Sequence, residues 1–216
     1  MKAAAGFSTV EVLLALTLGL WVMLAGSRVF VSALQSWHAQ DVAARLQEDA
    51  RLSLQRMARD IRMAGMFGCL RHDAMTFANP ALKQLFARPV HIEHAGDGNL
   101  RSLTLISAQA GELGGAPDWT LITDCRTTAH IADGHALPPP GLFAVPLRRQ
   151  VYRLNGSDLL LGSTGINAVL IGNVRRLEVA QRDDRVMLDL TLSDARHRVR
   201  AQTYFLTVTL RNGSSG

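Results

Sequence analysis

The sequence predicts an α+β protein in which one long N-terminal helix packs on an antiparallel β-sheet. Three observations lead to this fold class. An apolar run covers residues 12–26, a helical pattern of apolar residues continues it to residue 64, and short strand-like stretches fill the rest of the chain. We expect the second half of the helix to cover one face of the sheet with an apolar stripe.

The N-terminal segment is apolar enough to cross a membrane. Between Phe7 and Ser27 the only ionisable side chain is Glu11, and this span is as long as one transmembrane helix. A carboxylate inside such a segment is costly, so it marks a functional position. A secretory signal peptide cleaved near residues 25–27 and a plain membrane anchor are the alternatives, and neither of them explains Glu11.

Residues 28–64 contain no Pro and no Gly, so the helix is expected to continue through them. Their apolar positions recur in steps of three and four, which places them on one helical face: Val42, Leu46, Ala50, Leu54, Met57, Ile61 and Ala64. Charged residues, Asp60 among them, are expected mostly on the other faces. Gly65 is a suitable C-cap, and a helix from Phe7 to about Ala64 would be roughly 85–90 Å long.

The chain after Gly65 predicts an antiparallel meander. Strands are expected at 90–92, 102–106, 120–122, 150–154, 158–161, 177–180 and 185–192. Asn155-Gly156 predicts a hairpin turn, Asp183-Asp184 predicts a second turn, and the prolines at 138–140 predict a break between two halves of the body. Val186, Leu188, Leu190 and Leu192 alternate with polar residues and are expected to face the core, and residues 204–210 repeat this pattern.

Composition and charge narrow the function classes only partly. The chain has 216 residues and a formal charge of +5, and the part after the helix, on the order of 150 residues, is the size of one domain. Its apolar and charged fractions argue against disorder. The positive charge permits contact with nucleic acid, anionic lipid or an acidic partner, but the arginines are dispersed rather than gathered in one run.

The two cysteines, Cys69 and Cys125, predict a disulfide. An even cysteine count in an exported chain favours a disulfide over two buried thiols, and the membrane segment places the body outside the cytoplasm. Two cysteines alone would be an incomplete metal site.

The first residues resemble the signal of type IV prepilins and pseudopilins. A short leader with Lys2 precedes a Gly6-Phe7 junction, and Glu11 follows inside the apolar run. The resemblance implies that a dedicated peptidase cleaves after Gly6 and methylates the new N-terminus at Phe7. It also implies that Glu11 sits among apolar helices and pairs with the methylated amino group of a neighbouring subunit, which sets the axial register.

The end of the predicted helix resembles the minor pilins of the PilW type. This segment covers residues 59–69, with the sequence RDIRMAGMFGC. The resemblance implies the pilin fold and a low-abundance subunit that initiates type IV pilus assembly with other minor pilins, the major pilin and a tip adhesin. It implies five parts: leader 1–6, transmembrane half 7–27, amphipathic half 28–65, periplasmic β-rich domain 66–212 and flexible tail 213–216. The protein would sit in the inner membrane of a Gram-negative bacterium, at the assembly platform, before it enters the pilus.

Two other functions stay open. A J-type pseudopilin of a type II secretion system would have the same architecture. A DNA-uptake receptor would use a basic patch such as Arg196, Arg198 and Arg200, although scattered solvated arginines explain these residues as well.

An enzymatic function is not expected. His91, Glu93 and His94 lack the His-Glu-x-x-His spacing of a zinc protease, and the glycines near Ser163 do not form a Gly-x-Ser-x-Gly elbow. We therefore expect no catalytic residues, no metal and no cofactor.

Overall fold

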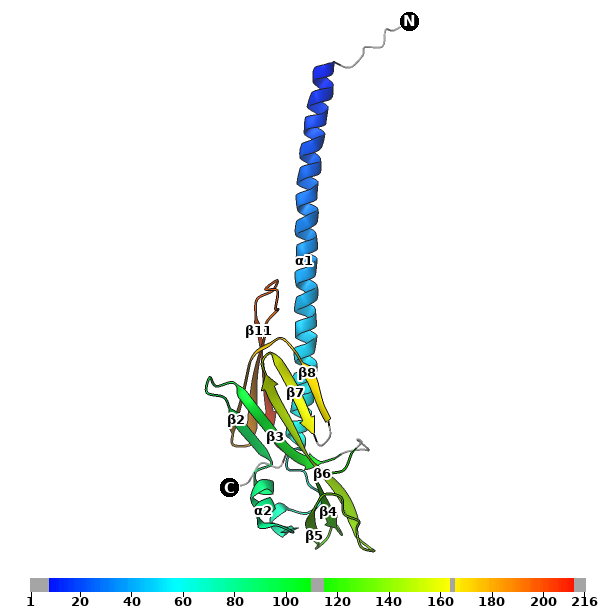
Figure 1. The fold of residues 1–216 in the computed structure, drawn as a ribbon, viewed down its shortest axis with the longest axis vertical. Helices are drawn as coiled ribbons and strands as arrows, with labels where there is room; N and C mark the ends of the chain where they lie inside the picture. Colours follow the sequence, from blue (N-terminus) through cyan, green and yellow to red (C-terminus); the bar gives the residue numbers. More distant parts are fainter. Residues whose placement is uncertain (1–7, 110–114, 164–165, 212–216) are drawn as a thin grey trace. The chain divides into compact units, whose positions relative to one another are not determined.

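The computed structural model of this chain describes residues 8–109, 115–163 and 166–211. The chain divides into two compact units, Met1–Arg45 and Leu46–Gly216. Helix α1, Thr9–Met63, provides the described helical residues of the first unit and the first element of the second (Figure 1). This confirms the expected long helix, and its end lies within one residue of the predicted one. The predicted leader 1–6 and tail 213–216 lie outside the described residues.

In the second unit, the short elements η1 His72–Ala74, β1 Thr76–Phe77 and α2 Pro80–Ala87 follow α1. The strands are then β2 Val90–His94, β3 Leu100–Ala108, β4 Trp119–Thr123, β5 Ala129–Asp133, β6 Phe143–Asn155, β7 Asp158–Ser163, β8 Ile166–Ile171, β9 Val174–Arg182, β10 Arg185–Leu192 and β11 Gln202–Thr209. All seven strands expected from the sequence are present. The structure is therefore α+β, as predicted.

The described strands form two sheets rather than one meander. The larger sheet has the order β1-β5-β4-β6-β3-β2, and β7 pairs with both β6 and β8; the smaller sheet has the order β11-β10-β9. Strand β6 is long enough for its first half to pair with β4 and its second half with β7. Only the short pair of β1 with β5 is parallel among these strands, so the expectation of a purely antiparallel sheet is corrected to a mixed one.

The predicted turns form where the backbone needs a positive φ. Gly156 has φ +60° in the hairpin between β6 and β7, and Gly65 has φ +79° after the end of α1. Both conformations are easily reached by glycine. Asp183 at φ +53° turns β9 into β10 as expected. The prolines at 138–140 do not separate two halves of the body, because β4 before them and β6 after them pair within one sheet.

The second part of α1 buries the predicted stripe. Six of its seven residues are buried, and Val42 is half-buried. The core-facing residues of β10 are completely buried as predicted: Val186, Leu188, Leu190 and Leu192. Asp60 differs from the expectation for the charged residues of the helix. Most of them were expected on the faces away from the apolar stripe, whereas Asp60 is buried. Burying these apolar side chains supplies the main stabilisation of the helix on the domain.

A second apolar cluster lies at the end of the domain that carries α2. Phe67, just after α1, packs against Phe86 of α2 with tilted rings and ring centroids 4.8 Å apart, and Phe86 meets Trp119 of β4 edge-on at 5.2 Å. Asn79 caps α2 by accepting a hydrogen bond from the Ala81 N–H, and Pro80 occupies the first helical position. This cluster holds the chain segment that leaves α1.

Candidate functional site

The apolar part of α1 is the first candidate site. Every described side chain from residue 8 to residue 38 is exposed within this chain, and α1 is long and apolar enough to cross a membrane. The exposed residues include the large side chains Leu20, Trp21, Met23 and Phe30. A helix with an apolar surface on all sides is typically covered by lipid or by other protein segments.

Glu11 lies in the first turn of this helix. Its backbone N–H donates to the Ser8 carbonyl at 3.0 Å, whereas its carboxylate has no ion pair or hydrogen bond within residues 8–109, 115–163 and 166–211. The first turn of a helix favours a negative charge, because the backbone N–H groups there are unpaired. Gly6 and Phe7, the expected cleavage and methylation positions, lie outside the described residues.

A shallow, open groove lies along one face of the helix and begins at Glu11. Its lining residues are Glu11, Val12, Ala15, Leu16, Gly19, Leu20 and Met23. Ala15 and Gly19 are small residues four positions apart, which is the spacing that lets two helices in a membrane approach closely. The carboxylate therefore lies at one end of a surface suited to a second helix.

The disulfide between Cys69 and Cys125 is present, with Cα atoms 5.3 Å apart. It ties the segment after α1 to the loop between β4 and β5. Asp124 next to it accepts hydrogen bonds from the backbone N–H groups of Arg126, Thr127 and Thr128. These bonds hold the pKa of the Asp124 carboxyl well below its usual range. An open pocket lies beside the disulfide.

The three arginines of the expected basic patch share the loop between β10 and β11 but differ in their contacts. Arg198 holds Asp194 through two guanidinium hydrogen bonds of 3.0 and 3.1 Å and donates its backbone N–H to the same carboxylate. This contact keeps the pKa of Asp194 well below its usual range. Arg196 and Arg200 are exposed and form no ion pair with a described residue. Arg198 thus fixes the loop, while the other two arginines face solvent.

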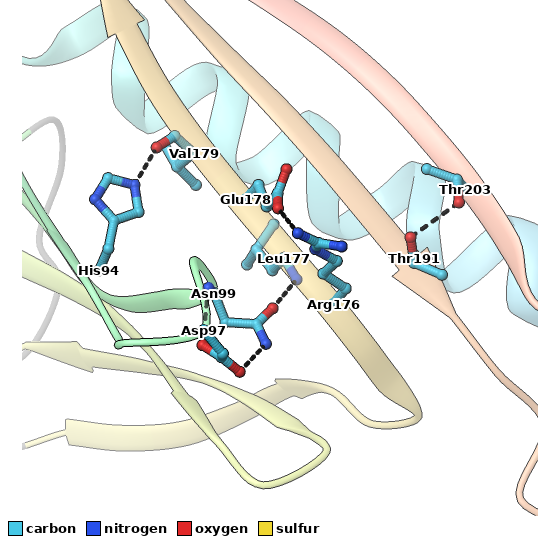
Figure 2. Close-up of polar contacts among 9 residues, drawn as sticks. All are labelled: His94, Asp97, Asn99, Arg176, Leu177, Glu178, Val179, Thr191 and Thr203. Atoms are coloured by element: carbon cyan, nitrogen blue, oxygen red, sulfur yellow. Dashed lines mark hydrogen bonds and ion pairs between the residues drawn. The ribbon is translucent and has the colours of Figure 1, made fainter.

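Figure 2 shows polar contacts between the two sheets that the sequence did not indicate. His94, at the end of β2, donates from Nε2 to the carbonyl of Val179 in β9 at 2.8 Å. The side-chain oxygen of Asn99 accepts the Leu177 N–H at 3.2 Å, and Asp97 holds the amide group of Asn99. These contacts depend on the packing of two distant chain segments, so no local motif could reveal them.

No group of three or more His, Cys, Asp or Glu side chains in the described part of the chain is placed to hold a metal ion. Comparisons of the chain with models of protein families, with curated proteins and with solved structures find no match. The function is therefore inferred from the residues of this chain and their geometry alone.

Proposed function

We propose that this chain is a minor pilin that helps to initiate type IV pilus assembly as part of a priming complex at the pilus tip. The observation that carries the proposal is Glu11, a single carboxylate at the start of a helix whose following 16 residues carry no charge. The same helix ends in the core of a disulfide-bonded β-sheet domain. A membrane anchor alone needs no carboxylate at this position.

The pairing of Glu11 follows from electrostatics in an apolar environment. A carboxylate among lipid tails or apolar helices is strongly destabilised unless a cation pairs with it. In the proposed assembly the methylated amino group at Phe7 of a neighbouring subunit supplies this cation. The groove with Ala15 and Gly19 would let the neighbouring helix approach Glu11 closely.

The proposed role implies a sequence of partners. A prepilin peptidase cleaves after Gly6 and methylates Phe7, and an inner-membrane assembly platform receives the processed subunit. Other minor pilins, the major pilin and a tip adhesin then join the complex. The β-sheet domain is periplasmic before incorporation and lies on the pilus afterwards.

Counting surface pili in a deletion strain tests the proposal. Wild-type protein is expected to restore pili, whereas Glu11→Ala is expected to be cleaved normally and to leave the cells without pili. Val22→Ala is a matched control, because it also shortens an exposed side chain of the same helix but leaves the charge unchanged. Mass spectrometry of the purified protein reports cleavage, and Gly6→Leu is expected to keep the uncleaved mass.

A deletion strain with normal pili would contradict the proposed role. If such a strain instead fails to secrete the substrates of a type II secretion system, the chain is a J-type pseudopilin. Full rescue of pili by Glu11→Ala would show that the carboxylate has no part in assembly.

A further inference from the structure

Strand β11 exposes half of its backbone hydrogen-bonding groups along an outer edge. The Leu210 N–H donates to the Asp184 carbonyl at 2.7 Å, and β11 pairs with β10 in one uninterrupted register. Hydrogen-bonded and non-hydrogen-bonded positions alternate in an antiparallel pair. The backbone groups that point away from β10 therefore belong to Thr203, Phe205, Thr207 and Thr209. Among the described residues none forms a hydrogen bond with these outward groups.

The opposite edge of the same sheet is partly occupied. The same alternation makes the backbone groups of Leu177 and Val179 in β9 point away from β10. Asn99 binds the first of these groups and His94 the second, as Figure 2 shows. Side chains of the other sheet thus bind two backbone groups of this outer edge, whereas no described residue binds the outward groups of β11.

The other sheet edges carry features that discourage strand pairing. Strand β2 has the charged or titratable residues His91 and Glu93 and a register shift before His94, and β1 has only two residues. The pairing of β7 with β8 also contains a register shift. Strand β11 has eight residues without a charge, a proline or a register shift. Natural proteins commonly block such an edge, because it pairs with strands of other chains.

The outer face of β11 is regular and uncharged. Phe205 is 74% exposed in the middle of the strand. Thr203 shares a hydrogen bond of 2.9 Å with Thr191 of β10, which fixes the outer side chains at this end (Figure 2). An added strand would place its own side chains beside these residues and would meet no charge along the strand.

The charged residues beside the two ends of β11 indicate which charges a ligand strand should carry. The loop before β11 carries the solvent-facing Arg196 and Arg200, and Arg211 follows the strand, beside the turn with Asp183 and Asp184. Residues 195–211 contain no acidic residue, so in a second copy neither β11 nor residues 195–201 before it supply a carboxylate to Arg196 and Arg200. A strand with an acidic residue at the end beside Arg196 and Arg200 does, whereas at the other end Asp183 and Asp184 already lie beside Arg211.

We propose that the outer edge of β11 binds an extended strand of another protein, uncharged along its length and acidic at the end that lies beside Arg196 and Arg200, and so extends the three-stranded sheet by one strand. Backbone hydrogen bonds to the outward groups would supply the affinity, and the acidic end beside Arg196 and Arg200 would supply selectivity. This inference goes beyond the pilus role and does not depend on it.

A peptide-binding experiment on the full chain in detergent micelles tests the inference. The probe is a fluorescein-labelled peptide with the sequence Glu-Thr-Val-Thr-Ile-Thr-Val-Thr-Glu, and fluorescence anisotropy reports its binding. Saturable binding is expected. A peptide of the same sequence with methyl groups on alternate backbone nitrogens is expected to bind at least about tenfold more weakly, because it cannot donate to the edge. This comparison requires no change in the protein.

Two sets of variants locate the binding edge. Thr207→Pro removes an outward N–H and no bond to β10, so the strand can tolerate it; it is expected to weaken binding about tenfold. Thr207→Val keeps the N–H and serves as the matched control. The double variant Arg196→Glu/Arg200→Glu is expected to reverse the charge preference and to bind a Lys-flanked peptide more tightly than the Glu-flanked one.

Three results would overturn the inference. The first is the absence of saturable binding. The second is equal binding of the methylated peptide, or unchanged binding by both Thr207→Pro and the double arginine variant. The third is self-association of the wild-type chain that Thr207→Pro abolishes, because the ligand of the edge would then be a second copy.

Discussion

Tyr152 donates a hydrogen bond of 2.5 Å from its hydroxyl group to Oδ2 of Asp60, and this bond joins strand β6 to the end of helix α1. Both side chains are buried. Arg56, one turn earlier in the helix, donates from Nε to the same oxygen at 3.0 Å. Burial raises the pKa of Tyr152 well above its usual range, so the hydroxyl stays protonated and remains a donor. The carboxylate of Asp60 is therefore paired and hydrogen-bonded, as a buried charge must be.

Replacing Tyr152 by Phe is expected to lower the free energy of unfolding by about 1–3 kcal/mol, because the buried carboxylate loses a donor. Urea denaturation of the full chain in detergent, followed by circular dichroism, measures the change. Tyr204→Phe is the matched control on β11, since that hydroxyl is only half-buried and bonds to the nearby Gln202. Equal stability of Tyr152→Phe and wild type would show that the bond adds nothing.

The helix stripe offers a second test of packing. Met57 is completely buried and Leu52 in the same helix is 52% exposed. Met57→Ala is expected to lower the free energy of unfolding by about 2–5 kcal/mol, because the truncation leaves a cavity in the core. Leu52→Ala is expected to change it by less than about 0.5 kcal/mol. The same urea titration checks both values, and similar losses for the two variants would contradict the observed face of the helix.

The sequence was sufficient for the features that depend on local periodicity. Apolar residues in steps of three and four correctly predicted the buried face of α1 from Leu46 onwards. The alternation of apolar and polar residues around Val186 and Leu188 correctly predicted the inner face of β10. In both cases one side of an element meets the core and the other meets solvent, so the pattern appears directly in the sequence. Gly65 and Gly156 were equally visible, because their backbone conformations favour glycine.

Contacts between distant segments could not be read in this way. Asp60 looks like another solvent-facing charge until β6 brings Tyr152 to it, 92 residues later in the chain. The division into two sheets has no local signal either, since β8 and β9 are joined by a short turn at Asn173 that resembles the hairpin turns. Glu11 is the opposite case: its sequence context indicated a site, but its proposed partner belongs to another chain.

Breaking the disulfide is expected to lower the free energy of unfolding by about 4 kcal/mol, because the bond closes a long loop in the unfolded chain. The two cysteines are 56 residues apart. Urea denaturation with and without a reducing agent measures the loss. The double variant Cys69→Ser/Cys125→Ser should have the lower stability under both conditions, and a wild type that does not respond to reduction would contradict the expectation.

The contact of Asp194 with Arg198 predicts a pH dependence. The hydrogen bonds from Arg198 hold the pKa of Asp194 below its usual range in the folded protein. Because the pKa of this carboxyl is lower in the folded protein than in the unfolded chain, its ionised form stabilises the protein fully at pH values above the unfolded pKa of about 3.9. This contribution is lost as the pH falls below that value. Wild type should therefore lose more stability than Asp194→Asn when urea denaturation is repeated between about pH 6 and pH 3.

Asp49→Asn controls for the loss of one negative charge, because Asp49 lies on an exposed part of α1. This variant should follow the wild-type pH profile. Since Asp194 fixes the loop that leads into β11, the Asp194→Asn variant should also show faster amide hydrogen exchange at residues 195–201 near neutral pH, where the ion pair is intact in the wild type. Identical exchange in the two proteins would mean that other contacts, and not this ion pair, hold the loop.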